Sequence, residues 1–536
     1  MTTRTPQLPK GNWAGYAWIA LVSGCSAFFL RRRAEFFHEY NGDIDTFLYQ
    51  AWRLLSGKLN YIDHFDSKLP IVPYLYVPSF LTGSFWGHRA ISDGVLMFSG
   101  VLIYFTCQDL CKLVSGEHKT SSLPASRVTA ALYIFFGSIL PDTAYSGHLF
   151  LFANMFLLAG CLLVLRGASN QRVGFMASGG ALLGLAIQIR PNILFSILGL
   201  IIFSFATRIL FLSQTNRPPR LYRSGRQFAV VAAFGILGFL LPFFPYALNS
   251  EHASSAYDLS YRLMRDWRRE AFGWGGSWEF IRSLFSLYTP RLLGIPYIYV
   301  LPLPVLSFNL VLLLRLSRGS KECFASAVGL SMAGYGYISG SIVSFYYSHT
   351  FPNYVFHDLW VYSLIAGTSL SIWNSTILGR PKRFAAMTNT LVLALCGLLL
   401  TQSLNIRHQE DTRTFYLPPS LLDTLENQSF SSPQNYSLYW RLRQKIPTFG
   451  AHSHWNEYAN FSISNLPLLK RYGLRNKASS VCGDYLNENR TYLVLFDPNQ
   501  FICREGMERS WALIKKYPYR KDSRPVELYI NSRFLD

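Results

Sequence analysis

The sequence predicts a polytopic α-helical membrane protein that ends in a small soluble domain of the α/β or α+β class. Half of the 536 residues are hydrophobic and 15% are charged, whereas about 25% of the residues of an ordinary soluble domain are charged. The apolar residues form blocks such as FAVVAAFGILGFLLPFFPYAL, from Phe228, and a spanning helix needs roughly 20 such residues. From about Arg407 onward these blocks disappear.

The formal net charge of +20 fits the same class. Lys and Arg collect in the cytoplasmic loops of membrane proteins. Here they gather in short segments between apolar blocks, at residues 4–10, 112–127, 166–172, 208–226, 315–321 and 380–383. A nucleic-acid partner is disfavoured, because no basic stripe with interleaved aromatics stands apart from these segments.

The alternation of basic and non-basic segments predicts about eleven transmembrane helices in residues 1–406 of a multi-pass protein of the cell inner (plasma) membrane. The N-terminus is then cytoplasmic, and residues 407–536 form the extracytoplasmic soluble domain. The first outer loop is residues 34–88. Its segment from Leu69 contains three prolines and is predicted to lie along the outer interface as a juxtamembrane segment. Arg31, Arg32 and Arg33 are exceptions to the charge rule, because they follow the first helix on the outer side.

The soluble tail contains short mixed runs that predict regular secondary structure. TYLVLFDP and PVELYINS have the composition of strands, and MERSWALIKKY has that of a helix.

The segment GDIDTFLYQAWRLLSGKLNYIDHFDSKLP, from Gly42, is the most informative in the chain. Helical spacing relates Asp43, Phe47, Ala51, Leu54 and Leu55. The spacing predicts an amphipathic helix on the membrane surface that ends at Gly57. Asp43 and Asp45 fall in its first turn, where an isolated acid commonly serves as an N-cap or as a partner of the helix dipole.

This segment resembles the first outer loop of the GT-C glycosyltransferases, especially the protein O-mannosyltransferase-like and lipid A aminoarabinose transferase-like families. The resemblance rests on Asp43, Phe47, the run AWRLLSG from Ala51 to Gly57, Tyr61, and Lys68-Leu69-Pro70. Ile44 stands where these families usually have a second acid, and Leu69 separates Lys68 from Pro70. Either Asp43 or Asp45 is therefore a candidate for the catalytic carboxylate.

Three later segments also resemble these families. GGALLGLAIQIRPNILF is similar to a Gly-rich helix that ends in a basic residue, here Arg190. NYVFHDLWVYSLIAG, from Asn353, is similar to a late helix that carries a His, here His357, although Asp358 follows it in place of the family's Tyr. In LPDTAYSGHLF, Asp142 and His148 flank an outer turn at which the families often have an acid.

The resemblance implies a GT-C-type membrane glycosyltransferase, a hexosyl- or pentosyltransferase, that takes its sugar from a polyprenyl-phosphate donor. The acceptor is a hydroxyl of a glycan, glycolipid or protein on the extracytoplasmic face, and the anomeric centre is inverted. By resemblance Asp43 is the general base and Lys68 holds the lipid phosphate. The predicted substrate-binding residues are Asp45, Lys68, Asp142, His148, Arg190, Arg262, Arg265 and His357.

Arg262 and Arg265 enter this set because a spacing of three places them on one helix face, where two cations can hold a phosphate. The equally simple interpretation is a solvated charged loop. For Asp142, the alternative to substrate binding is a carboxylate that is satisfied within its own turn. For His357, the alternative is a side chain that packs between helices.

No HExxH and no paired CxxC motif occurs, so no metal ligand or cofactor is predicted, although a divalent cation is not excluded. The alternative function is a transporter or flippase of lipid-linked glycans. Such proteins typically show internal repeats and charge near the membrane midplane. The sequence shows no repeat, and its polar residues gather at one face. A membrane scaffold is a third interpretation, and it is disfavoured because it gives the charged residues of the first outer loop no role.

Overall fold

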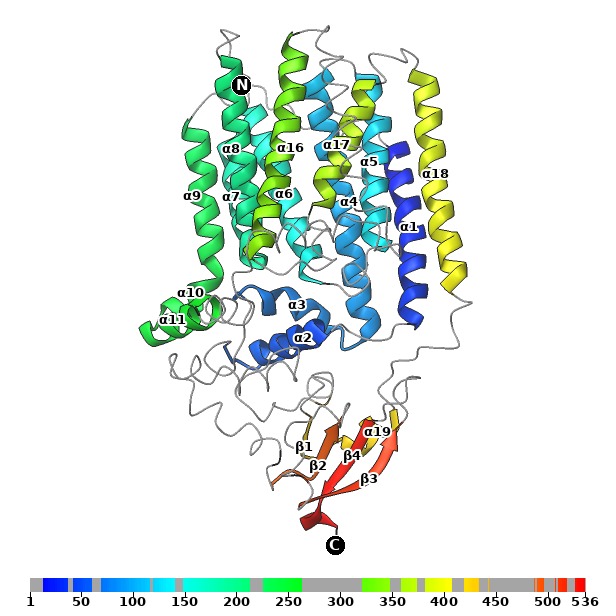
Figure 1. Cartoon of the computed structure of the whole chain (residues 1–536), viewed down its shortest axis with the longest axis vertical. Coiled ribbons are helices and arrows are strands. Elements are labelled where there is room, and N and C mark those ends of the chain that lie inside the picture. Colours follow the sequence, from blue (N-terminus) through cyan, green and yellow to red (C-terminus); the bar gives the residue numbers. More distant parts are fainter. Residues whose placement is uncertain are drawn as a thin grey trace, which may run out of the picture.

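The computed structural model describes residues 13–36, 42–59, 69–115, 119–139, 148–212, 225–262, 321–347, 358–373, 381–406, 419–432, 489–495, 510–517 and 526–535, with the single residues 442, 486 and 507. Long helices run side by side along one axis, and two short helices and a β-sheet lie at one end of them (Figure 1). The long helices are α1 (Trp13–Phe36), α4 (Phe85–Ser115), α5 (Lys119–Ile139), α6 (Leu149–Asn170), α7 (Val173–Ile189), α8 (Ile193–Leu212), α9 (Gly225–Leu240), α16 (Lys321–Tyr347), α17 (Leu359–Trp373) and α18 (Pro381–Ile406).

Within the described ranges, four helices are long and apolar enough to cross a membrane. Their spans are Trp86–Lys112, Leu149–Asn170, Gln227–Ala247 and Arg383–Leu404. Shorter apolar helices include Val173–Ile189, Ile193–Phe203 and Leu359–Ser371. A multi-helix membrane protein is therefore supported by length and composition, and the number of about eleven spans stays a prediction.

Three of the basic segments are flanked by helices that end or begin at one end of the bundle. The helix ends that flank residues 112–127, 166–172 and 208–226 lie at this end, and the β-sheet lies at the other (Figure 1). The helix directions thus follow the alternation that the charge pattern predicts. The assignment of the two ends to the cytoplasm and the exterior stays a prediction.

Two short helices, α2 (Gly42–Leu55) and α3 (Val72–Leu81), lie across the ends of the long helices on the sheet side (Figure 1). The predicted helix at Asp43 is confirmed as α2. The chain leaves α2 at Gly57, whose φ of +73° lies in the left-handed region that glycine favours. With 10 residues, α3 is too short to span a bilayer. The prediction that the segment from Leu69 does not span is therefore confirmed.

Two helix pairs, α7 with α9 and α8 with α16, pack with their backbones in contact. A methyl group added to Gly184 of α7 would lie 2.0 Å from the carbonyl oxygen of Gly235. One added to Gly199 of α8 would lie 2.0 Å from the carbonyl oxygen of Gly336. Small residues allow such close approach in membranes, where packing replaces the hydrophobic effect as the main driving force. These contacts fix α7 against α9 and α8 against α16.

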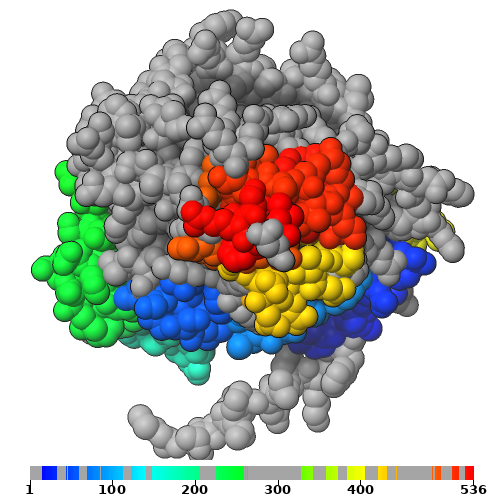
Figure 2. All heavy atoms as spheres, turned by 90° about the horizontal axis from the view of Figure 1, so that it is seen from below, coloured from blue at the N-terminus to red at the C-terminus, as the bar shows by residue number. Residues whose placement is uncertain are grey.

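Beyond α9 the chain turns along the same face as α2. A 3-10 turn (Leu241–Phe243), α10 (Phe244–Ala247), α11 (Ser250–Tyr257) and a π-helical segment (Asp258–Arg262) follow one another. Viewed from below, α10 and α11 appear in green, α2 and α3 in blue, and the sheet in orange and red (Figure 2). All of these elements contribute to one surface.

The tail contains α19 (Pro419–Leu425) and a sheet of β1 (Phe430–Ser431), β2 (Tyr492–Leu495), β3 (Trp511–Tyr517) and β4 (Val526–Asn531), followed by a 3-10 turn (Ser532–Phe534). The strand order is β1-β2-β4-β3. Only the pairing of β1 with β2 is parallel among these strands. The strands predicted in TYLVLFDP and PVELYINS are confirmed as β2 and β4.

The helix predicted in MERSWALIKKY is wrong, because residues 511–517 form β3. β3 pairs with β4 from Trp511 opposite Asn531 to Tyr517 opposite Val526, with an irregularity between Leu513 and Lys515. This pairing buries both end residues of the strand. A short run of mixed residues has no decisive period of its own, so tertiary pairing overrides its local preference.

Candidate functional site

The residues predicted to supply the catalytic carboxylate belong to the first turn of α2, and α2 lies at the end of the bundle that carries the sheet. The side chains of Asp43 and Asp45 are outside the described part of the structure. Four further predicted residues lie wholly outside it, namely Lys68, Asp142, Arg265 and His357. The structure therefore tests the location of His148, Arg190 and Arg262.

His148 and Arg190 are brought together by the ring of Phe150. His148 is the N-cap residue of α6 and is buried, and its ring stacks on Phe150 at a centroid distance of 5.1 Å and an angle of 21°. The guanidinium carbon of Arg190 lies 3.8 Å from the centroid of the same ring. A cation on an aromatic face is attracted by the quadrupole of the ring. Two residues more than 40 positions apart thus share one aromatic partner.

The local sequence explains the position of Arg190. It is the C-cap of α7 and has extended backbone angles, and Pro191 after it cannot continue the helix hydrogen bonding. Its backbone N–H donates to the carbonyl oxygen of Ala186 at 3.0 Å. Two residues earlier, Nε2 of Gln188 donates to the carbonyl oxygen of Phe239 at 3.0 Å and so joins this end of α7 to α9.

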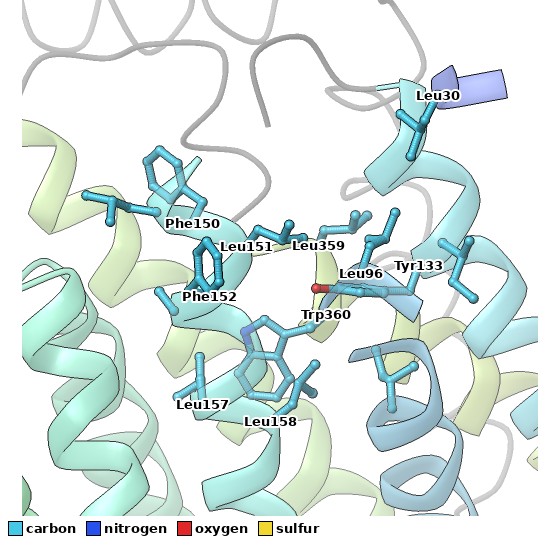
Figure 3. Close-up of a cluster of buried hydrophobic side chains, with 14 of the residues drawn as sticks. Leu30, Leu96, Tyr133, Phe150, Leu151, Phe152, Leu157, Leu158, Leu359 and Trp360 are labelled. Atoms are coloured by element: carbon cyan, nitrogen blue, oxygen red, sulfur yellow. The ribbon is translucent and has the colours of Figure 1, made fainter. Parts of the chain in front are cut away.

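Figure 3 shows a cluster of buried side chains to which Phe150 belongs. Phe152, Leu157 and Leu158 follow it along α6, and Leu359 and Trp360 come from α17. These side chains belong to one hydrophobic cluster. The cationic end of α7 therefore adjoins an apolar interior, which is the usual setting of a charge that serves a cavity or a bound ligand.

Tyr76 of α3 connects the surface helices to α6. Its buried ring lies 4.9 Å from the ring of Phe47 and 5.5 Å from that of Phe152. It also stacks with His88 of α4 at 6.0 Å, and Nδ1 of His88 is 2.9 Å from Oγ of Ser79. Phe47 lies one helical turn after Asp43, so these contacts hold the α2 helix over the start of α6.

Sequence reasoning missed a polar group at the beginning of α4. His88 and Arg89 are buried there, and Asp93 follows Arg89 by one turn. Charged residues inside an apolar span are costly and usually functional. The signal was present in the run HRAISDG, which interrupts the apolar sequence near Trp86.

A second buried polar group joins three helices near the predicted His357. Oγ of Ser341 on α16 donates to Oδ1 of Asp358 at 2.5 Å. Oγ of Ser196 on α8 lies 2.8 Å from Oγ of Ser341. Because the proton of Ser341 goes to the carboxylate, the hydroxyl of Ser196 is the donor in the second bond. Asp358, just before α17, is thereby fixed to α16 and α8.

Arg262 lies at the end of the π-helical segment and interacts with residues four and five positions before it. Its Nη1 is 3.1 Å from Oδ1 of Asp258, and its guanidinium lies 5.8 Å from the ring of Tyr257. π-Helical turns occur frequently at functional sites. The phosphate clamp with Arg265 stays a prediction.

In the described ranges, no group of three or more His, Cys, Asp or Glu residues could hold a metal ion.

Comparison with solved structures decides the fold class. The chain matches the crystal structure of ArnT from Cupriavidus metallidurans in the apo state with a TM-score of 0.55 and 12% sequence identity. The match covers 96% of this chain and 98% of that chain. The fold is that of ArnT. No family model matches the sequence, and no curated protein matches it either.

The ArnT-like fold confirms the resemblance to the GT-C glycosyltransferases that the first outer loop predicts, at the level of the fold. The match extends over the helix bundle and the tail together, because it covers nearly all of both chains. At 12% identity it does not transfer the roles of individual residues.

Proposed function

We propose that the protein is an integral membrane glycosyltransferase that moves a sugar from a polyprenyl phosphate to an acceptor hydroxyl, with inversion. The observation that carries the proposal is the ArnT-like fold over 96% of the chain. The group formed by His148, Phe150 and Arg190, at the start of α6, supports it from the chemistry of the chain.

The reaction assigned to this site is a direct displacement. The carboxylate of Asp43 takes the proton from the acceptor hydroxyl, whose oxygen forms a bond to the anomeric carbon of the donor. The bond between that carbon and the phosphate oxygen breaks, and the polyprenyl phosphate leaves with the electron pair. Asp45 lies in the same helical turn and is the alternative base.

Fixed cations assist the departure of the phosphate. Lys68 is assigned to this phosphate, and Arg190 supplies a second positive charge that Phe150 holds in place. Preorganised charge is effective at such a site because it needs no rearrangement as the leaving group gains charge. Arg262 and Arg265 are proposed as a further clamp from the α11 side.

The acceptor and the sugar are assigned to polar residues that precede α6 and α17 in the sequence. Asp142 and His148 belong to the first group, and His357 to the second. The anchored carboxylate of Asp358 supports an orienting role for the adjacent His357, because it fixes the backbone at the start of α17.

The proposed setting is the cell inner membrane, with residues 1–406 as the membrane domain and residues 407–536 as an extracytoplasmic domain. The partners are the lipid-linked donor, the bilayer, and a glycan, glycolipid or protein acceptor. No cofactor is assigned, and dependence on a divalent cation is a question for assay in the presence of a chelator.

The deciding experiment compares surface glycans of cells that contain the protein with those of cells from which it has been removed. Mass spectrometry of the glycans should show one sugar missing in the second case, and re-expression should restore it. Re-expression of Asp43→Asn at equal abundance should not restore the missing sugar. Identical glycans in all strains would refute the proposed transferase.

A further inference from the structure

The α2 helix carries a polar stripe on the face of Asp43. Thr46, Gln50 and Arg53 follow Asp43 at spacings of three, four and three residues, so they continue its face of the helix. Gln50 comes seven residues after Asp43, which places it within about 20° of the same direction and about 10 Å along the axis. The stripe therefore extends along α2 from Asp43, the proposed catalytic base.

This stripe is buried, in contrast to the polar face of an ordinary surface helix. Thr46 and Arg53 are 3% and 8% exposed, and Gln50 is fully buried. Ile44, Phe47 and Leu48, from the apolar part of the helix, are buried too. Both faces of α2 are therefore covered up to Ala51, and its polar residues are enclosed near the proposed site.

The side-chain amide of Gln50 has no hydrogen-bond partner among the described residues. Both its Oε1 and its Nε2 are buried without a hydrogen-bond partner in the described part of the chain, and so is Nε of Arg53. Buried side-chain amides almost always have partners, because an unmade hydrogen bond there carries the full cost of desolvation. Gln188, by comparison, is equally buried, and its Nε2 donates to the carbonyl oxygen of Phe239, so that only its Oε1 has no partner among the described residues.

We propose that Gln50 binds hydroxyl groups of a sugar in the active site and contributes to sugar specificity. An amide offers one acceptor oxygen and two N–H donors, which match the paired hydroxyls of a pyranose or furanose. Arg53 borders this position on the same face and supplies further N–H donors. A site built to hydrogen-bond hydroxyls rejects ligands that lack them, because its polar groups are then left unpaired. The proposal rests on the proposed transferase function and adds a determinant of its substrate.

The test is Gln50→Met, which keeps the length of the side chain and removes the amide. Glycan transfer in cells should fall by about tenfold or more, because hydrogen bonds to the sugar are lost. The melting temperature of the purified protein should stay unchanged or rise, because an unsatisfied buried amide is replaced by an apolar group. A structural amide would instead lower the melting temperature together with the activity.

Gln188→Met is the matched control. It removes an equally buried amide whose Nε2 has a partner within the protein. Its melting temperature should fall, while glycan transfer at a permissive temperature should persist at equal abundance. The two substitutions therefore separate loss of a ligand contact from loss of an internal contact.

The source of the sugar is distinguished by thermal shift with two probes, undecaprenyl phosphate and the same lipid carrying the transferred sugar. Undecaprenyl phosphate alone should stabilise Gln50→Met and the wild type equally. If the additional shift from the sugar is lost in Gln50→Met, the contact is with the donor. If that shift is retained or absent in both while transfer is lost, the contact is with the acceptor.

Two results would overturn the role of Gln50. One is full glycan transfer by Gln50→Met, and the other is a fall in its melting temperature like that of Gln188→Met. Either result leaves the proposed transferase intact if removal of the protein still eliminates a surface sugar. Failure of the proposed function is recognised separately, by unchanged glycans in cells without the protein.

Discussion

The guanidinium carbon of Arg190 lies 3.8 Å from the ring centre of Phe150, so the basic end of α7 rests on the aromatic beginning of α6. His148 stacks on the same ring. The two helices also meet at Gly160 and Gly179, where an added methyl group would lie within 3 Å of the opposite backbone. The close packing of α6 and α7 thus sets the place of a cation that their sequences supply separately.

Phe150→Leu should weaken binding of a lipid phosphate by about two- to thirtyfold, because the ring contributes roughly 0.5–2 kcal/mol to the placement of the arginine. Phe150→Tyr keeps the aromatic face and should bind like the wild type. Titration of the purified protein with undecaprenyl phosphate measures both. An unchanged dissociation constant for Phe150→Leu would show that Arg190 needs no aromatic support.

Asp43→Asn should lower the turnover number by about 10²–10⁴-fold, the usual contribution of a general base. Asp45→Asn, two residues further along the same turn, should retain most of the activity. Membrane insertion and abundance of both variants should match the wild type, as measured by immunoblotting of membranes. The reverse pattern of activities would assign the base to Asp45.

Lys68→Ala should raise the KM for the lipid-linked donor by about 10–150-fold, the range for loss of a charge-assisted hydrogen bond. The KM for the acceptor should change little. Lys58, an exposed lysine of the same outer loop, provides the control as Lys58→Ala. A larger effect on the acceptor than on the donor would remove Lys68 from the phosphate site.

Gly336→Ala should destabilise the protein by about 1–3 kcal/mol, as overpacking of a tight contact does. Its new methyl group would lie 2.3 Å from the carbonyl oxygen of Gly199. Gly329→Ala on the same helix meets no atom within 4 Å and should be neutral. Thermal melting in detergent compares the two. Equal melting temperatures would show that α8 and α16 separate easily.

Cysteine labelling tests the direction of the helices. In a background without native cysteines, Glu426→Cys in the tail should react with a membrane-impermeant maleimide added to whole cells. Gly225→Cys, at the start of α9 and next to the basic segment, should react only after the membrane is permeabilised. Both positions are exposed on the protein. Labelling of Gly225→Cys in intact cells would reverse the predicted topology.

The apolar blocks determined by themselves that the chain forms long helices, because a stretch of such residues leaves few other ways to satisfy the backbone. The motif at Asp43 likewise determined that α2 is an amphipathic helix that ends before Gly57. Helical spacing and a terminal glycine are local signals, and they need no knowledge of distant contacts. The resemblance of the same loop to the GT-C glycosyltransferases predicted the fold, and the comparison with a solved structure agrees with that prediction.

Only the tertiary structure decided that Trp511–Tyr517 is a strand, since its partner β4 supplies the hydrogen bonds. It likewise decided that Arg190 meets Phe150 and that the amide of Gln50 is buried without a hydrogen-bond partner among the described residues. Sequence specifies which groups a helix presents along its faces. Burial and partners depend on which other helices those faces meet, and such contacts join residues that no local pattern relates.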